Sequence, residues 1–591
     1  MKLGRGPLPA SKGPAQSAGC LLLCACLASH VATANAQALP GVRPTREEVT
    51  HPVTPPPRPQ NRLEIEGGIE RAPCALDGPE FRSIKFVVRS AEFDGLQGLT
   101  SADLAPSYAP FVGREVPIST VCEIRDRASA ILHDAGYIAA VQVPQQRIEG
   151  GVVRFQVLMA HLTQVRVRGE ATGAEAVLAA YLSRLTQHPL FNRFEAERYL
   201  LLASDLPGYT VRLTLRPAGT APGDVIGDVT VQRLPAYADM VVQNGGSPEL
   251  GPWGALLRGE LFGLTGLGDR TIFSIFSTPD LHEQQTVQIA HDMRLGGEGL
   301  GLSESFTYAW ARPTVPGVEV LSRTLFSTTE LSYPLVRRQS ETIRGSIGLD
   351  FVNQPVKLNH VDFTSDKLRV LFLRVGIDTE GAPTPGYSTA VPPWHFNSVV
   401  ELRQGLRILD ATPDCTVVAC ALPPSRLDGQ SDATLVRFIA LGELRPTPLF
   451  TLALAARGQY AWKSLLSFEQ FAAGNYTVGR GYDPGAILGD RGFGTQVELR
   501  YGSRIARSAS KPAIEGYVFW DQASVSNRDH ISSTLGPEHL HSIGTGLRVS
   551  WQRFALDTNL AIPLSRVGFN NRRPDPRLLV SLTTRLWPWN Y

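Results

Sequence analysis

The most constraining feature of this chain is the pattern of residues 235–591. They form segments of about ten residues in which apolar and polar side chains alternate, separated by Gly, Pro, Asn and Asp. In Phe450–Tyr460, for example, Leu452 and Leu454 share one face and Arg457 lies on the other. A soluble β-sandwich shows the same alternation, but here the polar faces mix full charges with small residues, as the wall of a water-filled lumen does. The pattern therefore favours strands of a transmembrane β-barrel.

The ends and the number of these segments support the same fold. Trp and Tyr residues gather near segment ends, as they do at membrane interfaces: Tyr460, Trp462, Trp520, Trp551, Trp587, Trp589 and Tyr591. We count sixteen segments, which begin near Ala236, Gly254, Arg270, Glu283, Gly299, Val320, Glu341, Leu368, Phe396, Thr434, Leu449, Phe493, Ala513, Gly544, Arg553 and Leu578. An even number returns the last strand to the side of the first. We therefore predict a 16-stranded antiparallel barrel.

The first 36 residues have the features of a secretory signal peptide. Lys2 and Arg5 begin a basic region, Gly19–Val31 is a short apolar run, and Ala34–Ala36 is a small-residue cleavage site. No later apolar run is long enough to span a membrane as a helix. We expect residues 1–36 to be removed during export.

Residues 37–80 form a Pro-rich segment before the first folded module. Val53–Pro59 contains four prolines and is expected to be an extended linker. A short helix near Thr45–His51 is a candidate plug for the barrel.

Residues 81–160 and 161–234 repeat one order of elements, β-α-α-β-β. In the first module, Ile84–Arg89 is predicted to be a strand, and a long helix is predicted from an N-cap at Ser119 to Gly136. The repeat predicts two α+β modules of similar fold ahead of the barrel.

Seven cysteines are present, and three of them lie in the signal peptide. The other four allow three pairings, among which we favour the near pairs Cys74–Cys122 and Cys415–Cys420 because export leads to an oxidising compartment. No histidine lies close in sequence to either pair, and neither pair has zinc-like spacing, so we expect no metal site.

Several short stretches occur in the order and spacing of a known family. They are Leu132–Tyr137 with Gly151–Phe155, Leu206–Tyr209, Val242–Ser247, Gly266–Asp269, Ser332–Arg337, and Gly481–Tyr482 with Gly489–Gly492. On these stretches the chain resembles the outer-membrane transporters of two-partner secretion, the ShlB/FhaC/HecB (TpsB) haemolysin secretion/activation family. The resemblance covers nearly the whole chain after the signal peptide.

This resemblance implies two polypeptide-transport-associated (POTRA) domains in the periplasm, at 81–160 and 161–234, and an outer-membrane barrel at 235–591. Such a pore translocates an unfolded TpsA-like exoprotein, of adhesin or haemolysin type, to the cell surface by type V secretion. The implied partners are that exoprotein and outer-membrane lipid. An insertase of the same superfamily and a diffusion porin or receptor remain alternatives, although insertases usually carry more POTRA domains and porins need none.

Other classes of function find no support in the sequence. No phosphate-binding Gly-Lys-Ser/Thr, His-Glu-x-x-His or Gly-x-Ser-x-Gly motif occurs, so we expect no enzyme, no nucleotide and no cofactor. The formal net charge of +2 gives no reason to expect a nucleic-acid partner.

The resemblance also implies that the sixth extracellular loop, about residues 463–492, folds back into the barrel. Its tip is Arg480, Gly481 and Tyr482, and the chain departs from the family by an extra Gly479 before the arginine. An arginine inside a lumen requires a carboxylate partner.

Asp521, on the predicted thirteenth strand, is the favoured partner of Arg480, because Trp520 has the lipid-facing parity and Asp521 therefore faces inward. Glu515 has the same inward parity and is the rival; alternatively, both acids only solvate the lumen. Asp490 and Arg491 either brace the base of the loop or form a solvated charge pair.

Overall fold

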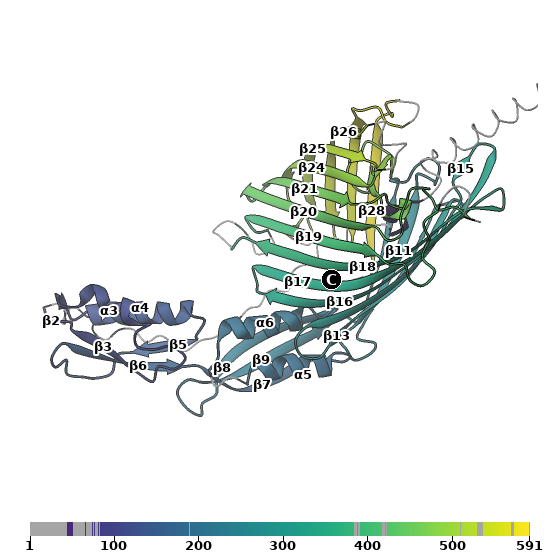
Figure 1. The fold of residues 1–591 in the computed structure, drawn as a ribbon. Helices are drawn as coiled ribbons and strands as arrows, with labels where there is room; N and C mark the ends of the chain where they lie inside the picture. The colour runs from purple at the N-terminus through teal and green to yellow at the C-terminus, as the bar shows by residue number, and fades with distance from the viewer. Residues whose placement is uncertain are drawn as a thin grey trace, which may run out of the picture.

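The computed structural model describes residues 44–50, 65–66, 74, 76, 78, 81, 83–187, 190–382, 387, 391–415, 420, 422–506, 508, 510–528, 536–568 and 572–589. The predicted signal peptide and most of the Pro-rich segment lie outside these residues. Two small α/β modules precede a β-barrel, and the second module lies between the first module and the barrel (Figure 1). No helix among the described residues is long and apolar enough to cross a membrane.

The first module is a three-stranded sheet of order β3-β6-β5 (Ser90–Asp94, Val152–Met159, Ala139–Gln142) that packs on helix α4, Thr120–Asp134. A two-stranded sheet, β2 (Lys85–Val87) with β4 (Glu115–Pro117), and the short helices α3 (Ala105–Tyr108) and η3 (Ala109–Phe111) complete it. Helix α4 begins after Ser119, whose side chain makes no capping hydrogen bond. Gly136 follows the helix with φ 89°, a left-handed conformation that favours glycine.

The strand predicted over Ile84–Arg89 is present as the shorter β2, but it does not belong to the main sheet. The chain changes sheets there, because Arg89 and Ser90 both donate backbone hydrogen bonds to the Gly151 carbonyl, and β2 pairs with β4 instead of the main sheet. The strand of the main sheet is β3, which lies parallel to β6.

The second module contains helices α5 (Glu175–Arg184) and α6 (Arg193–Ser204) and a sheet of order β1-β8-β9-β7. Its own strands are β7 (His161–Gly169), β8 (Tyr209–Pro217) and β9 (Asp224–Arg233). The fourth strand, β1 (Ile65–Glu66), comes from the Pro-rich segment and pairs in parallel with the edge of β8. The sequence pattern did not predict this pairing.

The barrel closes through antiparallel pairing of its first strand with its last, β10 with β28. Its sixteen strands are β10 (Ala236–Gln243), β11 (Gly254–Phe262), β12 (Arg270–Ser277), β13 (Gln284–Leu295), β14 (Leu300–Ala311), β16 (Val318–Arg337), β17 (Glu341–Leu358), β18 (Val361–Glu380), β19 (Trp394–Gly405), β20 (Thr434–Thr447), β21 (Phe450–Ala461), β24 (Arg491–Gly502), β25 (Ala513–Ser526), β26 (Glu538–Trp551), β27 (Phe554–Pro563) and β28 (Arg577–Trp587). The two-residue β15 (Thr314–Val315) pairs only with β16.

The strand predicted to begin near Leu368 begins at Val361. Strands β16, β17 and β18 are each 18 to 20 residues long, which is longer than the predicted segments of about ten residues. About ten residues suffice to cross the membrane, so these strands extend beyond it. Val320 and Val356 are buried in a small apolar cluster within the extension. This cluster gives the hairpin a core of its own.

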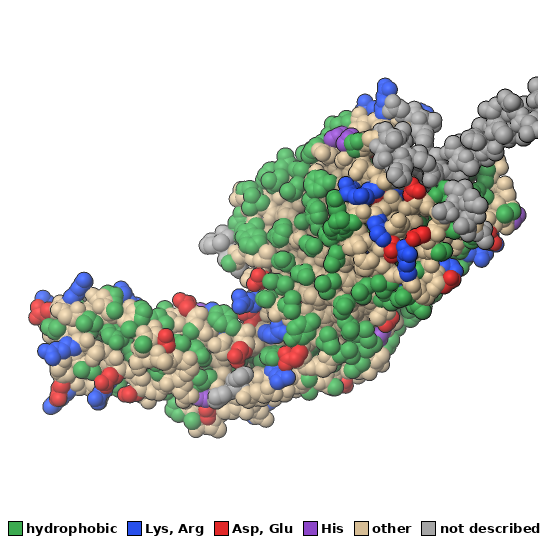
Figure 2. Space-filling model, viewed as in Figure 1, with side chains coloured by type: hydrophobic (Ala, Val, Ile, Leu, Met, Phe, Trp, Pro, Cys, Tyr) green, Lys and Arg blue, Asp and Glu red, His purple; other side chains and the backbone are tan. Residues whose placement is uncertain are grey.

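The barrel is apolar outside and polar inside. In β21, Leu452 and Leu454 are 37% and 49% exposed, whereas Thr451 and Ala453 are 7% and 3% exposed. Figure 2 shows hydrophobic side chains gathered over the barrel strands. This arrangement is the reverse of a soluble core and matches a wall that faces lipid.

Candidate functional site

The candidate site is loop 6, residues 462–490, which connects β21 to β24 and lies inside the barrel. It contains a 3-10 turn, η4 (Ser467–Glu469), and a hairpin of β22 (Phe471–Ala473) with β23 (Ile487–Gly489). Val478 and Tyr482 are buried against Val525 and Leu540 of the wall. The loop is therefore a packed element and not a solvated surface turn.

The tip of loop 6 contacts the wall through Arg480 and Asp521. The guanidinium donates to the carboxylate through Nε (3.0 Å) and Nη2 (2.6 Å), and the backbone N–H of Arg480 donates to it as well (2.9 Å). Nη1 reaches Glu498 on β24 at 2.5 Å, and the guanidinium lies 3.6 Å from the ring centre of Phe519. Asp521 is 0% exposed. A bidentate pair with a stacked aromatic ring fixes both position and orientation of the tip.

Glycines shape the backbone on both sides of Arg480. The additional Gly479 has φ 116°, and a Cβ there would lie 2.6 Å from Leu540 Cδ1. A Cβ on Gly481 would lie 2.9 Å from the Pro563 nitrogen. Glycine is therefore required at both positions for the tip to approach the wall.

Tyr482 anchors the other side of the tip. Its ring is fully buried, and its hydroxyl donates to the carbonyls of His541 (2.8 Å) and Ser565 (3.1 Å). The backbone N–H of Ser565 donates back to the hydroxyl at 2.8 Å. The structure thus brings Arg480, Tyr482 and Asp521 together on the wall formed by β25–β27.

Glu515, the rival partner of Arg480, contacts different arginines. Its carboxylate accepts from Arg504 and Arg548, each at 3.1 Å. Arg548 also binds Glu498 at 3.1 Å, so Glu515 belongs to the same charged network one step away from Arg480.

At the base of loop 6, Asp490 and Arg491 have separate partners. Asp490 is 0% exposed and accepts from Arg426 (2.5 Å) and from the backbone N–H of Leu465 (2.9 Å). Arg491 donates to the Tyr460 hydroxyl (2.8 Å) and lies over its ring. Asp490 is thus neither solvated nor bonded to Arg491; it ties loop 6 to the loop between β19 and β20.

A short helix from the Pro-rich segment, α2 (Arg46–Thr50), also lies in the lumen. Thr45 and Glu48 form a capping box, in which the Glu48 carboxylate accepts from the Thr45 N–H (2.8 Å) and the Thr45 hydroxyl accepts from the Glu48 N–H (3.2 Å). Val49 is fully buried in a cluster with Phe326 of β16 and Phe468 of loop 6. The helix therefore packs between the barrel wall and loop 6.

A second charged cluster joins this helix, loop 6 and the wall. Arg403 on β19 is 0% exposed and contacts Asp350 (2.7 Å), Glu401 (2.7 Å) and Glu469 of loop 6 (2.8 Å). Arg46 of α2 contacts Asp350 at 3.2 Å. Sequence analysis did not single out any of these residues.

Both favoured disulfides, Cys74–Cys122 and Cys415–Cys420, are present in the structure. The first joins the end of the Pro-rich segment to α4, and the second lies in the loop between β19 and β20. Among the described residues, no group of three or more His, Cys, Asp or Glu could hold a metal ion.

Removal of the first disulfide is expected to destabilise the first module strongly. Because Cys74 and Cys122 are 48 residues apart, the loss of the link in C74S/C122S should cost about 4 kcal/mol. C415S/C420S, which removes the disulfide in the loop between β19 and β20, should leave the first module as resistant as in wild type and serves as the control. Protease resistance of the first module in the full chain, measured against urea, checks this order; equal losses would contradict it.

Residues 227–549 match the haemolysin secretion/activation proteins ShlB/FhaC/HecB, and residues 86–159 match the ShlB-type POTRA domain. The chain belongs to this family. A curated relative is the heme/hemopexin transporter protein HuxB of Haemophilus influenzae, which is 20% identical over 488 residues, 79% of this chain and 81% of HuxB.

Solved structures share the fold. CdiB from Escherichia coli superposes with a TM-score of 0.69 at 17% identity, covering 88% of this chain and 94% of CdiB. CdiB from Acinetobacter baumannii gives 0.61 at 18% identity, covering 95% and 97%. As a ShlB/FhaC/HecB protein, the chain is an outer-membrane pore of two-partner secretion whose POTRA domains lie in the periplasm.

The lumen of this ShlB/FhaC/HecB barrel contains a cavity of about 1350 Å³. Its lining includes Asp205 at the end of α6 and Arg480 at the loop-6 tip. The cavity therefore runs from the second POTRA domain to the tip of loop 6, where α2 and loop 6 fill the rest of the lumen.

Proposed function

We propose that this transporter captures one unfolded exoprotein, of adhesin or haemolysin type, by strand addition at the edge of β8 and passes it through the barrel. The observation that carries this proposal is the parallel pairing of β1 with β8, Ile65 with Leu213 and Glu66 with Thr214. That edge accepts an extended chain through main-chain hydrogen bonds, which need little sequence specificity. A secreted chain can bind there in the same way.

The resting lumen is closed by α2 and loop 6, so passage requires their displacement. Arg480, Tyr482 and the Arg403 cluster hold the closed arrangement, and we propose that loop 6 acts as an internal latch. Transport uses no nucleotide, no nucleic acid and no catalytic group; folding of the exoprotein outside the cell makes passage one-way. Contact with lipid is through the apolar outer wall.

Removal of β1 from the edge is expected to strengthen capture. I65P removes a backbone donor in β1 without changing any residue of the second POTRA domain. The full-length variant should bind the unfolded exoprotein several-fold more tightly than wild type, as measured by titration. The control is P57A in the same segment, which should bind as wild type does; equal affinity of I65P and wild type would contradict capture at this edge.

Deletion of the gene tests the function itself. We expect loss of one exoprotein from the culture medium and the cell surface, with normal amounts of other outer-membrane proteins. Broad loss of outer-membrane proteins would instead support the insertase alternative, and normal secretion with altered solute permeability would support a porin.

A further inference from the structure

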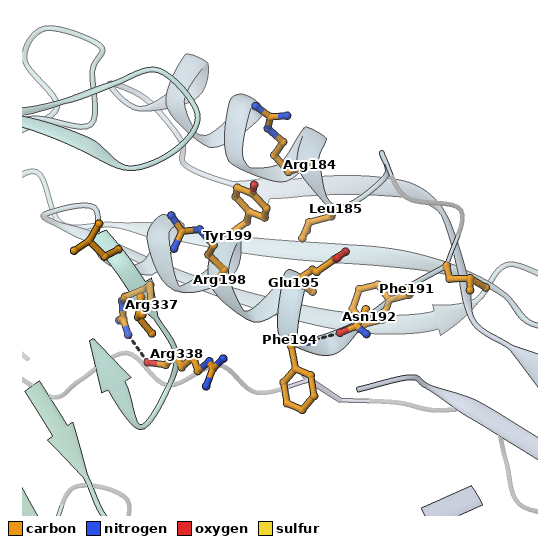
Figure 3. Close-up of a pocket in the computed structure, with 14 residues that line it drawn as sticks. Arg184, Leu185, Phe191, Asn192, Phe194, Glu195, Arg198, Tyr199, Arg337 and Arg338 are labelled. Atoms are coloured by element: carbon orange, nitrogen blue, oxygen red, sulfur yellow. Dashed lines mark hydrogen bonds between the residues drawn. The ribbon is translucent and has the colours of Figure 1, made fainter. Parts of the chain in front are cut away.

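A second cavity lies outside the lumen, where the second POTRA domain meets the barrel (Figure 3). Its volume is about 390 Å³, and it is bounded by α5, α6 and the turn between β16 and β17. The lining includes four arginines and one carboxylate: Arg184, Arg198, Arg337, Arg338 and Glu195. Nothing in the transport path through the lumen requires this basic cavity.

Two of the four arginines are neutralised by acids outside the lining. Arg184 contacts Glu298 at 2.8 Å, and Arg337 binds Asp205 through Nε (2.7 Å) and Nη2 (2.8 Å). These pairs join the POTRA domain to the barrel on two sides of the cavity.

The other two arginines, Arg198 and Arg338, have N–H donors that are not used in hydrogen bonds to described residues. Both recorded hydrogen bonds of Arg198 use Nη2, to the Tyr333 hydroxyl (3.4 Å) and the Pro334 carbonyl (3.1 Å). The Arg338 side chain is exposed and has no recorded partner among the described residues. In Figure 3 the Glu195 carboxylate points away from the Arg198 guanidinium. Arg198 and Arg338 therefore both line the cavity and keep N–H donors for an anion.

The cavity also opens onto the lipid-facing wall. Strand β16 ends at the periplasmic side, and its outward residues Leu331, Tyr333 and Leu335 are 42%, 36% and 57% exposed. Leu335 itself lines the cavity. A tyrosine beside such a stripe marks the level of lipid headgroups, so the arginines lie where headgroups of the periplasmic leaflet lie.

We propose that this cavity binds the headgroup of an anionic phospholipid from the periplasmic leaflet. Arg198 and Arg338 bind its phosphodiester, and its acyl chains lie along Leu331 and Leu335. Arginine suits a phosphate because its planar fork donates two parallel hydrogen bonds. The continuity of basic cavity and apolar wall favours a lipid over an acidic polypeptide, which has no chains to cover that wall. The bound lipid bridges the second POTRA domain and the barrel.

Native mass spectrometry of the full-length protein in detergent tests the proposal. The probes are phosphatidylglycerol and phosphatidylcholine with identical acyl chains, each added at the same concentration. Wild type should retain phosphatidylglycerol about tenfold better than phosphatidylcholine, because the choline cation offsets the phosphate charge and is repelled by the two arginines. R198Q/R338Q should lose this preference. R89Q/R114Q, which removes the same charge from exposed sites on the first module, should keep it.

Three results would overturn the proposal. One is an unchanged lipid preference in R198Q/R338Q. Another is displacement of phosphatidylglycerol by glycerol 3-phosphate at equal concentration, which would assign the cavity to a free phosphate. The last is retained lipid binding with lost binding of the exoprotein, which would assign it to a polypeptide. If the double variant does not fold, the single variant R338Q is used instead. The Arg338 side chain has no hydrogen-bond or ion-pair partner among the described residues, so its replacement should not disturb folding. R338Q should weaken the preference for phosphatidylglycerol about threefold.

Discussion

Replacement of Arg480 by alanine is expected to release the tip of loop 6 from the wall and to leave the pore open at rest. The change leaves Asp521 buried without its charge partner, and removal of one member of such a pair typically costs about 3–5 kcal/mol. Loop 6 should then become accessible to protease from outside the barrel, and entry of solutes through the pore should rise at least tenfold. Both quantities can be measured on intact cells.

Conservative variants separate charge from geometry at this site. R480K keeps the positive charge but loses the bidentate contact with Asp521 and the flat stacking on Phe519, so we expect an intermediate phenotype. R491A, at the base of the loop, loses an exposed bond to Tyr460 and should behave as wild type does. A docked, protease-resistant loop in R480A would contradict the role assigned to this arginine.

Replacement of Arg403 by alanine is expected to have an effect of similar size on the barrel itself. Three buried or nearly buried carboxylates, those of Asp350, Glu401 and Glu469, would lose their shared cation. The cost should be about 3–5 kcal/mol, because Arg46, Arg374 and Arg437 would compensate the three carboxylates only in part. Both α2 and loop 6 should loosen, since each contributes to this cluster.

The free energy of unfolding of R403A, measured with urea in lipid vesicles, checks this expectation. R407A is the matched control: Arg407 also contacts two acids, Asp414 and Asp432, but its side chain is 55% exposed. An exposed pair contributes about 1 kcal/mol or less. Similar losses of unfolding free energy in R403A and R407A would show that burial of the Arg403 cluster does not increase its contribution to stability.

The barrel was predictable from the sequence because lipid on one side and water on the other impose a two-residue period on every strand. The two modules were predictable because the order of their elements repeats. The change of sheet at Val88 was not predictable from the sequence. The alternation of apolar and polar side chains continues through Val88, and only hydrogen bonds to the Gly151 carbonyl interrupt the strand pairing there. Likewise, a two-residue strand such as β1 has no local pattern of its own.

In the candidate site, the alternation of side chains along the strand was enough to predict that Asp521 faces inward. In the structure Asp521 accepts a hydrogen bond from Arg480. The same alternation directs Glu401 and Arg403 inward, but their partners depend on how loop 6 folds and on the barrel register. Arg46 and Asp350 are 304 residues apart in the chain. Arg426, the partner of Asp490, lies in a different loop 64 residues away. Such contacts follow from the closed barrel and not from local sequence.

The most direct test of the account is a disulfide that holds loop 6 to the wall. A Cβ added to Gly494 of β24 would lie 3.1 Å from Val478 Cβ, so V478C/G494C can form a disulfide after a small adjustment. If loop 6 must leave the wall for transport, the oxidised variant should secrete less than about a tenth of the wild-type amount of exoprotein. Reduction should restore secretion, with the single variants and reductant-treated wild type as controls. Full secretion by the oxidised variant would contradict the account.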